Sequence, residues 1–243
     1  MIQACCFDLG NTLTNDTLIT RNSVRTMAEW LLQNGYISDV QKFIETYQEV
    51  NQTTQRPFIS HTFGEVDFFS STFDRLGIDG VSPEKALSIY REIVGRHTRV
   101  SPDLTDTFDY LHSRGIRTAL LSNERSARID AFFRSTGLEP WFETVVVSER
   151  VGFEKPDLRI FREALSRLQI PAEEAGTVLM FGDNSIADGA CTRIGMPFVL
   201  VTGYKNRDWY FEKGADNLPD HTIELITRQN LDTLLHSISP DLF

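Results

Sequence analysis

The sequence predicts an α/β protein in which helices cover both faces of a parallel β-sheet and a helical domain is inserted into the chain. From about residue 101 onward, short apolar runs alternate with amphipathic helical stretches, which is typical of a parallel sheet. Residues 14–100 carry only helical stripes of apolar side chains. A chain of 243 residues with 41% apolar residues is long enough for one or two domains with substantial cores.

The first strand is predicted at residues 2–7, an apolar run that ends at Asp8. Four helical stripes follow it, at residues 24–32, 40–50, 66–76 and 86–94. Ser82 and Pro83 open the fourth stripe as an N-cap and a first-turn proline. Residues 14–100 are far too long for an ordinary crossover, so we expect an inserted helical domain there and a core domain built from residues 1–13 and 101–243.

The second half of the chain continues the core. Further strands are predicted at residues 116–121, 144–147, 177–181, 198–201 and 222–227. Helices are predicted between and after them, at residues 101–115, 127–135, 157–168, 186–194 and 231–238. This alternation is what predicts parallel pairing and helices on both faces of the sheet.

Composition excludes several classes of partner. A formal net charge of −10 argues against nucleic acid and gives no reason to expect binding to an anionic membrane. No apolar run approaches the ~20 residues of a spanning helix, and no signal-peptide pattern fits the start. Cys5, Cys6 and Cys191 lack a disulfide spacing, so we expect buried free thiols in the reducing cytoplasm. The sequence makes no prediction of oligomeric state.

Polar side chains follow four of the predicted strands, either at the strand end or, for Lys155, after a short loop. They are Asp8, then Ser122 and Asn123, then Lys155, then Asp183 with Asp188 five residues beyond it. Ligands of open α/β sheets bind outside the carboxyl ends of the strands. One polar turn residue at such a place is ordinary, but a set of carboxylates, a hydroxyl and a lysine at four strand ends predicts a site.

This set of side chains suits phosphoryl transfer. Asp8 and Asp183 would repel a phosphate dianion, and a hard cation such as Mg²⁺ with oxygen ligands would remove that repulsion. Lys155 and the Ser122 hydroxyl would hold the phosphoryl oxygens. Asp8 would attack phosphorus and form an aspartyl phosphate that water hydrolyses.

The motifs resemble those of the haloacid dehalogenase superfamily along the whole chain. Residues 7–13, Phe-Asp-Leu-Gly-Asn-Thr-Leu, resemble its first motif, and residues 120–123, Leu-Leu-Ser-Asn, resemble its second. Lys155-Pro156 resembles the third, and residues 182–188, Gly-Asp-Asn-Ser-Ile-Ala-Asp, resemble the fourth. Each motif alone is weak, but all four in order at strand ends are specific. The resemblance implies a Rossmann-like core and a helical cap at residues 14–100 that covers the site.

The resemblance also implies a role for each matching residue. Asp8 would be the nucleophile and a magnesium ligand, the Gly10 carbonyl and Asp183 would be further ligands, and Asp188 would support the metal's water shell or orient Lys155. Ser122 and the backbone amide of Asn123 would bind the phosphoryl group, and Lys155 would neutralise the nucleophile. The substrate would be a small phosphorylated metabolite.

Gly10 departs from the pattern, because most phosphatases of this family have an aspartate there as general acid and base. Family members with a similar Asp-Leu-Gly-Asn motif include one that acts on a sugar 1-phosphate. Without a proton donor at position 10, we expect a preference for activated leaving groups such as sugar 1-phosphates. Asp16 or a residue of the cap would be the other source of the proton.

Three other functions remain open. A 2-haloacid dehalogenase would also lack an aspartate at position 10, but it needs no metal and lacks the aspartate of the fourth motif, which is intact here at Asp183. A phosphonate-cleaving lyase would need a Schiff-base lysine in the cap, where Lys42 and Lys85 are poor candidates. The third is a pseudo-enzyme that binds a phosphorylated metabolite or a partner without turnover.

Overall fold

The computed structural model describes residues 1–54, 65–205 and 221–238. The chain divides into two compact units, one made of Met1–Asp16 and Arg99–Phe243 and the other of Thr17–Thr98. The sequence-based domains were residues 1–13 with 101–243, and residues 14–100. Each unit is described by itself below.

The first unit contains a six-stranded sheet in which every neighbouring pair is parallel. Its strands follow the order β3-β2-β1-β4-β5-β6 across the sheet. Their bounds are β1 Ala4–Phe7, β2 Arg117–Ser122, β3 Thr144–Val147, β4 Val178–Gly182, β5 Phe198–Val201 and β6 Thr222–Ile223. The predicted α/β class with a parallel sheet is confirmed.

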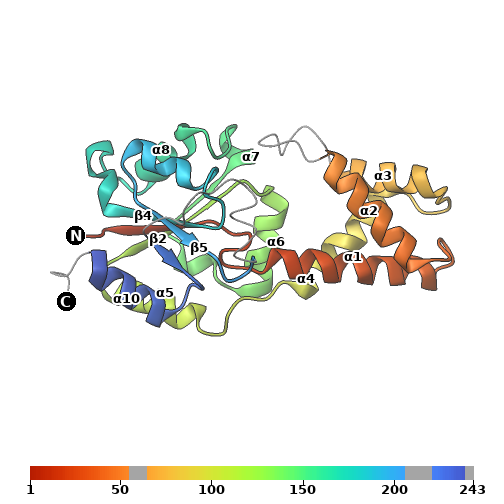
Figure 1. Cartoon of the computed structure of the whole chain (residues 1–243), viewed down its shortest axis with the longest axis horizontal. Coiled ribbons are helices and arrows are strands. Elements are labelled where there is room, and N and C mark those ends of the chain that lie inside the picture. Colours follow the sequence, from red (N-terminus) through yellow and green to blue (C-terminus); the bar gives the residue numbers. More distant parts are fainter. Residues whose placement is uncertain (55–64, 206–220, 239–243) are drawn as a thin grey trace. The chain divides into compact units, whose positions relative to one another are not determined.

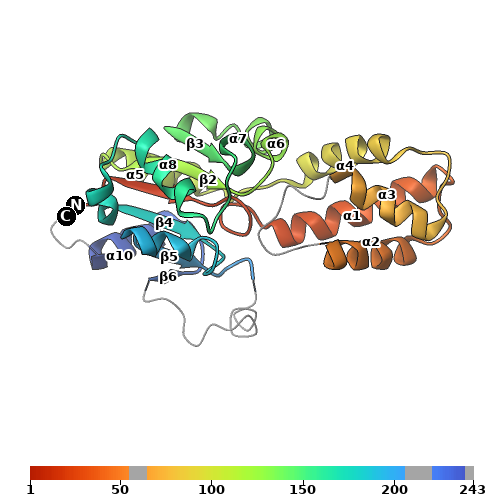
Figure 2. The ribbon, with the colours of Figure 1, turned by 90° about the horizontal axis from the view of Figure 1, so that it is seen from above.

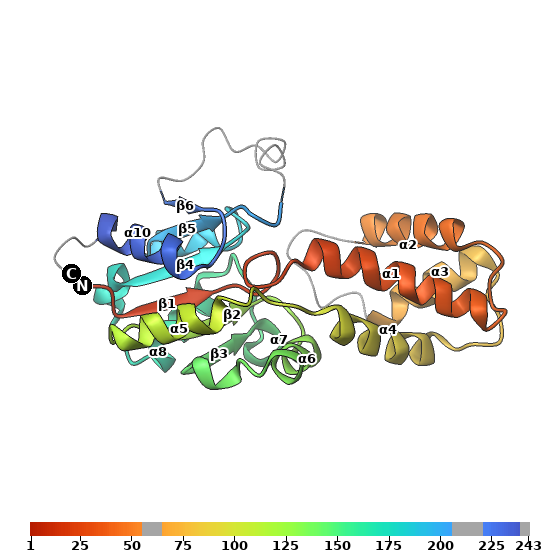
Figure 3. The same ribbon diagram turned by 90° about the horizontal axis from the view of Figure 1, so that it is seen from below.

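Alternate side chains of the buried strands enter two separate cores. Cys5 and Phe7 of β1 lie in the cluster that includes helices α5 (Leu104–Ser113), α6 (Ser126–Thr136) and α10 (Arg228–Ile238). Ala4 and Cys6 face the opposite cluster, which includes α8 (Leu158–Arg167) and the 3₁₀ helix η3 (Gly189–Ile194). Figure 1 shows α8 on one side of the sheet and α5 with α10 on the other, and Figure 3 shows the α5 and α10 side. The sheet is therefore covered on both faces, as parallel sheets generally are.

Two segments differ from their predicted form, and three short helices were not predicted. The strand expected at residues 222–227 is only Thr222–Ile223, because the chain turns at Leu225, whose carbonyl accepts hydrogen bonds from Thr227 N and Asn230 Nδ2. A one-turn helix, α7 (Ser148–Val151), follows β3 directly. The helix expected from residue 186 starts only at Gly189, because Asn184 folds the residues before it into a turn: its Oδ1 accepts from the backbone amides of Ile186 and Ala187. Two short 3₁₀ helices, η1 (Glu139–Trp141) and η2 (Ala172–Thr177), were not predicted.

The described residues of the second unit, 17–54 and 65–98, form helices joined by short turns. Its helices are α1 (Asp16–Gln33), α2 (Val40–Thr54), α3 (Glu65–Leu76) and α4 (Pro83–His97), shown in Figure 2. The predicted N-cap at Ser82 is present, with its side chain accepting from Lys85 N at 3.2 Å. Apolar side chains from the four helices form one core, which includes Met27, Phe43, Phe69 and Ala86. Among the described helices of the chain, none is both long and apolar enough to cross a membrane.

Candidate active site

The register of the sheet brings the predicted site residues to one edge. Phe7 of β1 is paired with Leu120 of β2 and with Phe181 of β4, so the ends of these three neighbouring strands are level. Asp8 continues from β1, with its amide donating to the carbonyl of Phe181 at 2.8 Å. Ser122 ends β2 and Asp183 follows β4. The carboxyl ends of parallel strands form the ligand-binding edge of such sheets, and these side chains lie there.

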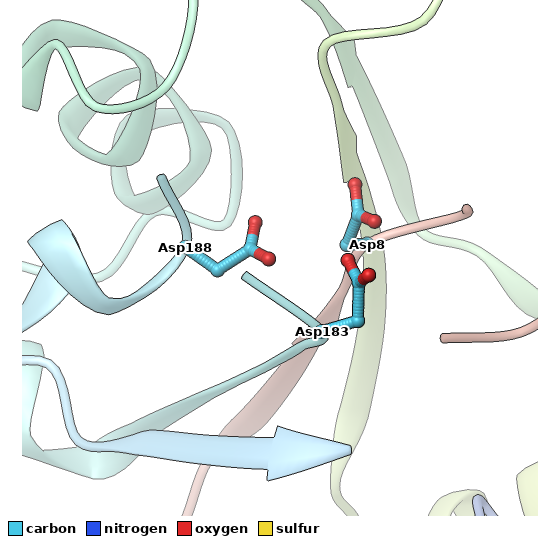
Figure 4. Close-up of side chains that lie close together, drawn as sticks. All are labelled: Asp8, Asp183 and Asp188. Atoms are coloured by element: carbon cyan, nitrogen blue, oxygen red, sulfur yellow. The ribbon is translucent and has the colours of Figure 1, made fainter. Parts of the chain in front are cut away.

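Three carboxylates meet at this edge. Asp8, Asp183 and Asp188 each offer an oxygen, and these atoms all lie within 4.8 Å of one another. Figure 4 shows the Asp188 carboxylate directed toward those of Asp8 and Asp183. All three residues are buried, with 8%, 6% and 1% of their surface exposed. Buried like charges at this spacing are stabilised by a nearby cation or a bound proton, because removal from water and mutual repulsion both disfavour the ionised forms.

Lys155 supplies a cation to this cluster. Its Nζ lies 2.6 Å from Oδ1 of Asp8 and 2.6 Å from Oδ1 of Asp188, and it donates to the carbonyl of Leu121 at 2.9 Å. The ammonium group thus lies between the predicted nucleophile and the second acidic residue of the fourth motif. The Lys155 side chain is only 2% exposed, so water screens these contacts little.

Asn123 fixes the backbone from which Lys155 extends. Its Nδ2 donates to the Lys155 carbonyl at 2.8 Å, and its Oδ1 accepts from the Lys155 amide at 2.8 Å. This reciprocal pair connects the end of β2 to the segment that precedes α8. The side chain of Asn123 therefore positions Lys155.

Burial and the neighbouring charges shift the pKa values of these side chains in opposite directions. Burial raises the pKa of Asp8 well above its usual range, and this effect outweighs the lowering by Lys155. Burial likewise raises the pKa of Asp183, against the lowering effect of Lys205. Burial alone would lower the pKa of Lys155, but Asp188 and Asp8 outweigh it and raise that pKa above its ordinary value. Lys155 therefore stays protonated at neutral pH.

The loop after β4 is built so that Asp188 returns to the site. The Asn184 amide donates to Oδ2 of Asp188 at 3.0 Å, and the Asp188 amide donates to the Asn184 carbonyl at 2.8 Å. Gly182 makes room for this return, since a Cβ there would lie 2.6 Å from Cβ of Asp188. A side chain at position 182 is therefore incompatible with the observed place of Asp188.

Ser122 and Gly10 complete the predicted set. Ser122 is 1% exposed, and its hydroxyl oxygen accepts from the Glu124 amide at 3.2 Å. Gly10 has no positive φ angle, so its backbone does not itself require glycine. A Cβ at Gly10 would lie 3.1 Å from Oδ2 of Asp16.

Three neighbours of the site were not predicted from the sequence. Lys205 forms an ion pair with Oδ2 of Asp183. It follows β5 by four residues, so the strand-end rule that found the other residues also applied to it. Arg128 in the first turn of α6 pairs with Asp16 at 3.1 Å, and the Leu121 carbonyl accepts from Lys155. Nothing in the sequence around Arg128 or Leu121 indicates these contacts.

The chain is similar to known proteins along most of its length. A family model described as haloacid dehalogenase-like hydrolase matches residues 2–188. The glyceraldehyde 3-phosphate phosphatase of Methanopyrus kandleri is 26% identical over 227 residues, which cover 92% of this chain and 94% of that protein. The ribulose-1,5-bisphosphate 5-phosphatase of Halopiger xanaduensis is 29% identical over 216 residues, covering 86% of this chain and 88% of that protein.

Solved structures share the fold. A HAD phosphatase from Thermococcus onnurineus matches with a TM-score of 0.66 and 20% identity, over 96% of this chain and 98% of that chain. A 2-haloacid dehalogenase from Pseudomonas syringae pv. Tomato also matches with a TM-score of 0.66, at 21% identity over 98% of this chain and 99% of that chain. The fold is thus common to both reactions, whereas the full-length relatives above are phosphatases. The chain belongs to the haloacid dehalogenase-like hydrolases, as an enzyme of the phosphatase type.

Proposed function

We propose that the protein is a magnesium-dependent phosphohydrolase that removes phosphate from a small phosphorylated metabolite through an aspartyl phosphate on Asp8. The single observation that carries this proposal is the buried cluster of Asp8, Asp183 and Asp188 with the Lys155 ammonium 2.6 Å from two of its carboxylates. It combines a nucleophile, a set of oxygen ligands and a fixed cation within one edge of the sheet.

The residues present fit a hard divalent cation. Three carboxylates whose oxygens lie within 4.8 Å of one another supply the hard oxygen ligands that Mg²⁺ prefers. Asp8, the Gly10 carbonyl and Asp183 would hold the ion, and Asp188, which contacts Lys155, would support them. When bound, Mg²⁺ would offset the repulsion between these carboxylates and a phosphate dianion.

The side chains of the chain would carry the reaction itself. A carboxylate oxygen of Asp8 attacks phosphorus, and the bond from phosphorus to the ester oxygen breaks. Lys155 and the Ser122 hydroxyl, with the Asn123 amide, would bind the phosphoryl oxygens, which carry most of the charge in the transition state. Water then hydrolyses the aspartyl phosphate and regenerates Asp8.

The names of the relatives support a proposal for the class of substrate. Both full-length relatives described above are named for phosphorylated sugars, and we infer that this protein acts on a small phosphorylated sugar or a similar metabolite. We also infer a cytoplasmic location, which is consistent with three buried cysteines that form no disulfide.

The test is hydrolysis of p-nitrophenyl phosphate and of a panel of phosphorylated sugars, with Mg²⁺ and with chelator. We expect activity that chelator abolishes and that Asp8→Asn removes. Retention of activity on a 2-haloacid in chelator would instead support the dehalogenase reaction. Binding of phosphorylated sugars without turnover of any substrate would support a pseudo-enzyme.

Lys42 and Lys85 are both exposed, which gives no support to a Schiff-base lyase.

A further inference from the structure

The turn that follows β1 brings Asp16 back beside Gly10. The Leu9 carbonyl accepts hydrogen bonds from the amides of Leu13 at 3.0 Å and Thr14 at 3.1 Å, which closes the turn. Gly10 and Thr14 form an isolated bridge across it. Asp16 follows two residues later, within the same compact unit as Asp8. Its Oδ2 would lie 3.1 Å from a Cβ at position 10, so this carboxylate lies where a side chain of residue 10 would begin.

The two oxygens of Asp16 have different surroundings. Oδ1 accepts from the Thr14 hydroxyl at 2.6 Å and from Nη2 of Arg128 at 3.1 Å. In the part of the chain that the structure describes, no hydrogen bond engages Oδ2, which faces Gly10. The side chain is 20% exposed and that of Arg128 is 12% exposed. Oδ1 of Asp16 is therefore held by two hydrogen bonds. Oδ2 lies beside Gly10, which is two residues after the nucleophile Asp8.

Phosphoryl transfer to Asp8 needs a proton donor of this kind. The departing oxygen of an alkyl ester must be protonated, and the water that later attacks the aspartyl phosphate must lose a proton. Asp8, Asp183 and Asp188 are committed to the cationic cluster with Lys155 and Lys205. Gly10 has no side chain to offer. Asp16 is the carboxylate next to Asp8 along this turn that is held in place and keeps one oxygen unengaged.

We propose that Asp16 is the general acid and base of this enzyme, which supplies from position 16 the carboxyl group that position 10 lacks. The inference rests on the function proposed above. In the first step, Asp8 forms a bond to phosphorus, the bond to the ester oxygen breaks, and that oxygen takes its electron pair and the proton of Asp16 to leave as an alcohol. In the second step, water gives its proton to the Asp16 carboxylate as its oxygen bonds to phosphorus. The phosphorus–Asp8 bond breaks, inorganic phosphate leaves, and Asp16 is protonated again.

This assignment changes the expected substrate range. Without a proton donor, only esters with activated leaving groups would turn over well, as the sequence at Gly10 suggests. With Asp16 in that role, simple alkyl phosphates, including primary sugar phosphates, become substrates of the wild-type enzyme. General acid–base help is worth about 10²–10⁴-fold in rate, and that factor should depend on Asp16.

The test compares wild type and Asp16→Asn on an alkyl phosphate and on p-nitrophenyl phosphate, with Mg²⁺. Asparagine has nearly the same shape and can still accept from Thr14 and Arg128. We expect kcat/KM for the alkyl ester to fall by about 10²–10⁴-fold and kcat/KM for the aryl ester by less than about tenfold, since the aryl oxide needs no proton to leave. We also expect a burst of nitrophenol equal to the enzyme concentration, because water attack on the aspartyl phosphate has lost its base.

Two further variants separate a catalytic role from a structural one. Asp130→Asn, which removes an exposed ion-paired aspartate of the same helix as Arg128, should leave both esters unaffected. The double variant Gly10→Asp with Asp16→Asn returns a carboxyl group to position 10, where φ is not positive, and should restore alkyl turnover.

The outcomes that would overturn the assignment differ from those that would overturn the proposed function. An equal loss on both esters without a burst would make Asp16 a structural residue. A wild type that prefers aryl esters, unchanged in Asp16→Asn, would show that no proton donor acts there. Both results leave the phosphatase function in place. A wild type that hydrolyses neither ester with Mg²⁺ would overturn the proposed function and the role of Asp16 with it.

Discussion

Nζ of Lys155 lies 2.6 Å from Oδ1 of Asp188, and both side chains are only 2% exposed. The two residues come from different motifs, 33 positions apart in the sequence. Asp188 is itself held by the Asn184 amide, and Lys155 by the reciprocal hydrogen bonds of Asn123. The pair therefore fixes the ammonium group beside Asp8, where it can stabilise charge on the nucleophile and on a transferred phosphoryl group.

Replacing Lys155 should lower both catalysis and stability, and the two effects can be measured separately. In Lys155→Met, Asp8 and Asp188 lose the cation that both contact, and an unpaired buried charge costs about 3–5 kcal/mol. We expect a lower free energy of unfolding in chelator and a fall in kcat of about 10²–10³-fold with Mg²⁺. Denaturant unfolding and steady-state kinetics measure the two effects. Lys42→Met, at an exposed lysine, is the control. A wild-type kcat in Lys155→Met would show that another cation stabilises the nucleophile and the phosphoryl group.

Lys205 and a metal ion should compete for Asp183. The Lys205 ammonium pairs with Oδ2 of Asp183, one of the three clustered carboxylates. Lys205→Met removes a competing positive charge, so we expect tighter Mg²⁺ binding by isothermal titration calorimetry. Asp183→Asn removes an anionic ligand, so we expect weaker binding. Unchanged Mg²⁺ affinity in both variants would mean that the ion does not bind at Asp183.

Gly182 should tolerate no side chain. A Cβ at that position would lie 2.6 Å from Cβ of Asp188, so Gly182→Ala must displace Asp188 from Lys155. We expect a loss of about 1–3 kcal/mol in the free energy of unfolding and a reduced kcat. Gly176→Ala is the matched control, because its Cβ would meet its nearest neighbour at an ordinary 3.7 Å. Wild-type kcat in Gly182→Ala would contradict the role of Asp188 in positioning Lys155.

The cysteines should resist thiol reagents in the folded protein. Burial raises the pKa of Cys6 to about 12, and it also raises those of Cys5 and Cys191. These raised values favour the folded state at pH values below the usual thiol pKa, and that contribution is lost as pH rises toward the folded-state values. At pH 8 we expect no reaction with Ellman's reagent until denaturant is added, and three thiols per chain afterwards. Rapid labelling without denaturant would show that the sheet opens locally.

The site residues were predictable because each lies next to a local signal. Asp8, Ser122 and Asp183 each lie at or just after the end of an apolar run, and the parallel sheet requires such ends to lie at one edge. Lys205 meets the same condition after β5, but it belongs to none of the four motifs and was not predicted. The shortened β6 was mispredicted because a turn at Leu225, held by the Asn230 side chain, ends the strand where the apolar pattern continues.

Most strands and helices, and the residue types that follow each strand, could be predicted from the sequence, because they depend on periodicity and turn chemistry over a few neighbouring positions. Long-range packing set the strand order β3-β2-β1-β4-β5-β6 and the contacts of Lys155 with Asp8 and Asp188. It also decided that Asp16 lies against Gly10 and pairs with Arg128, 112 positions away. Such contacts depend on how distant segments pack, so the sequence left open whether Asp16 or a residue of the cap lies beside Gly10.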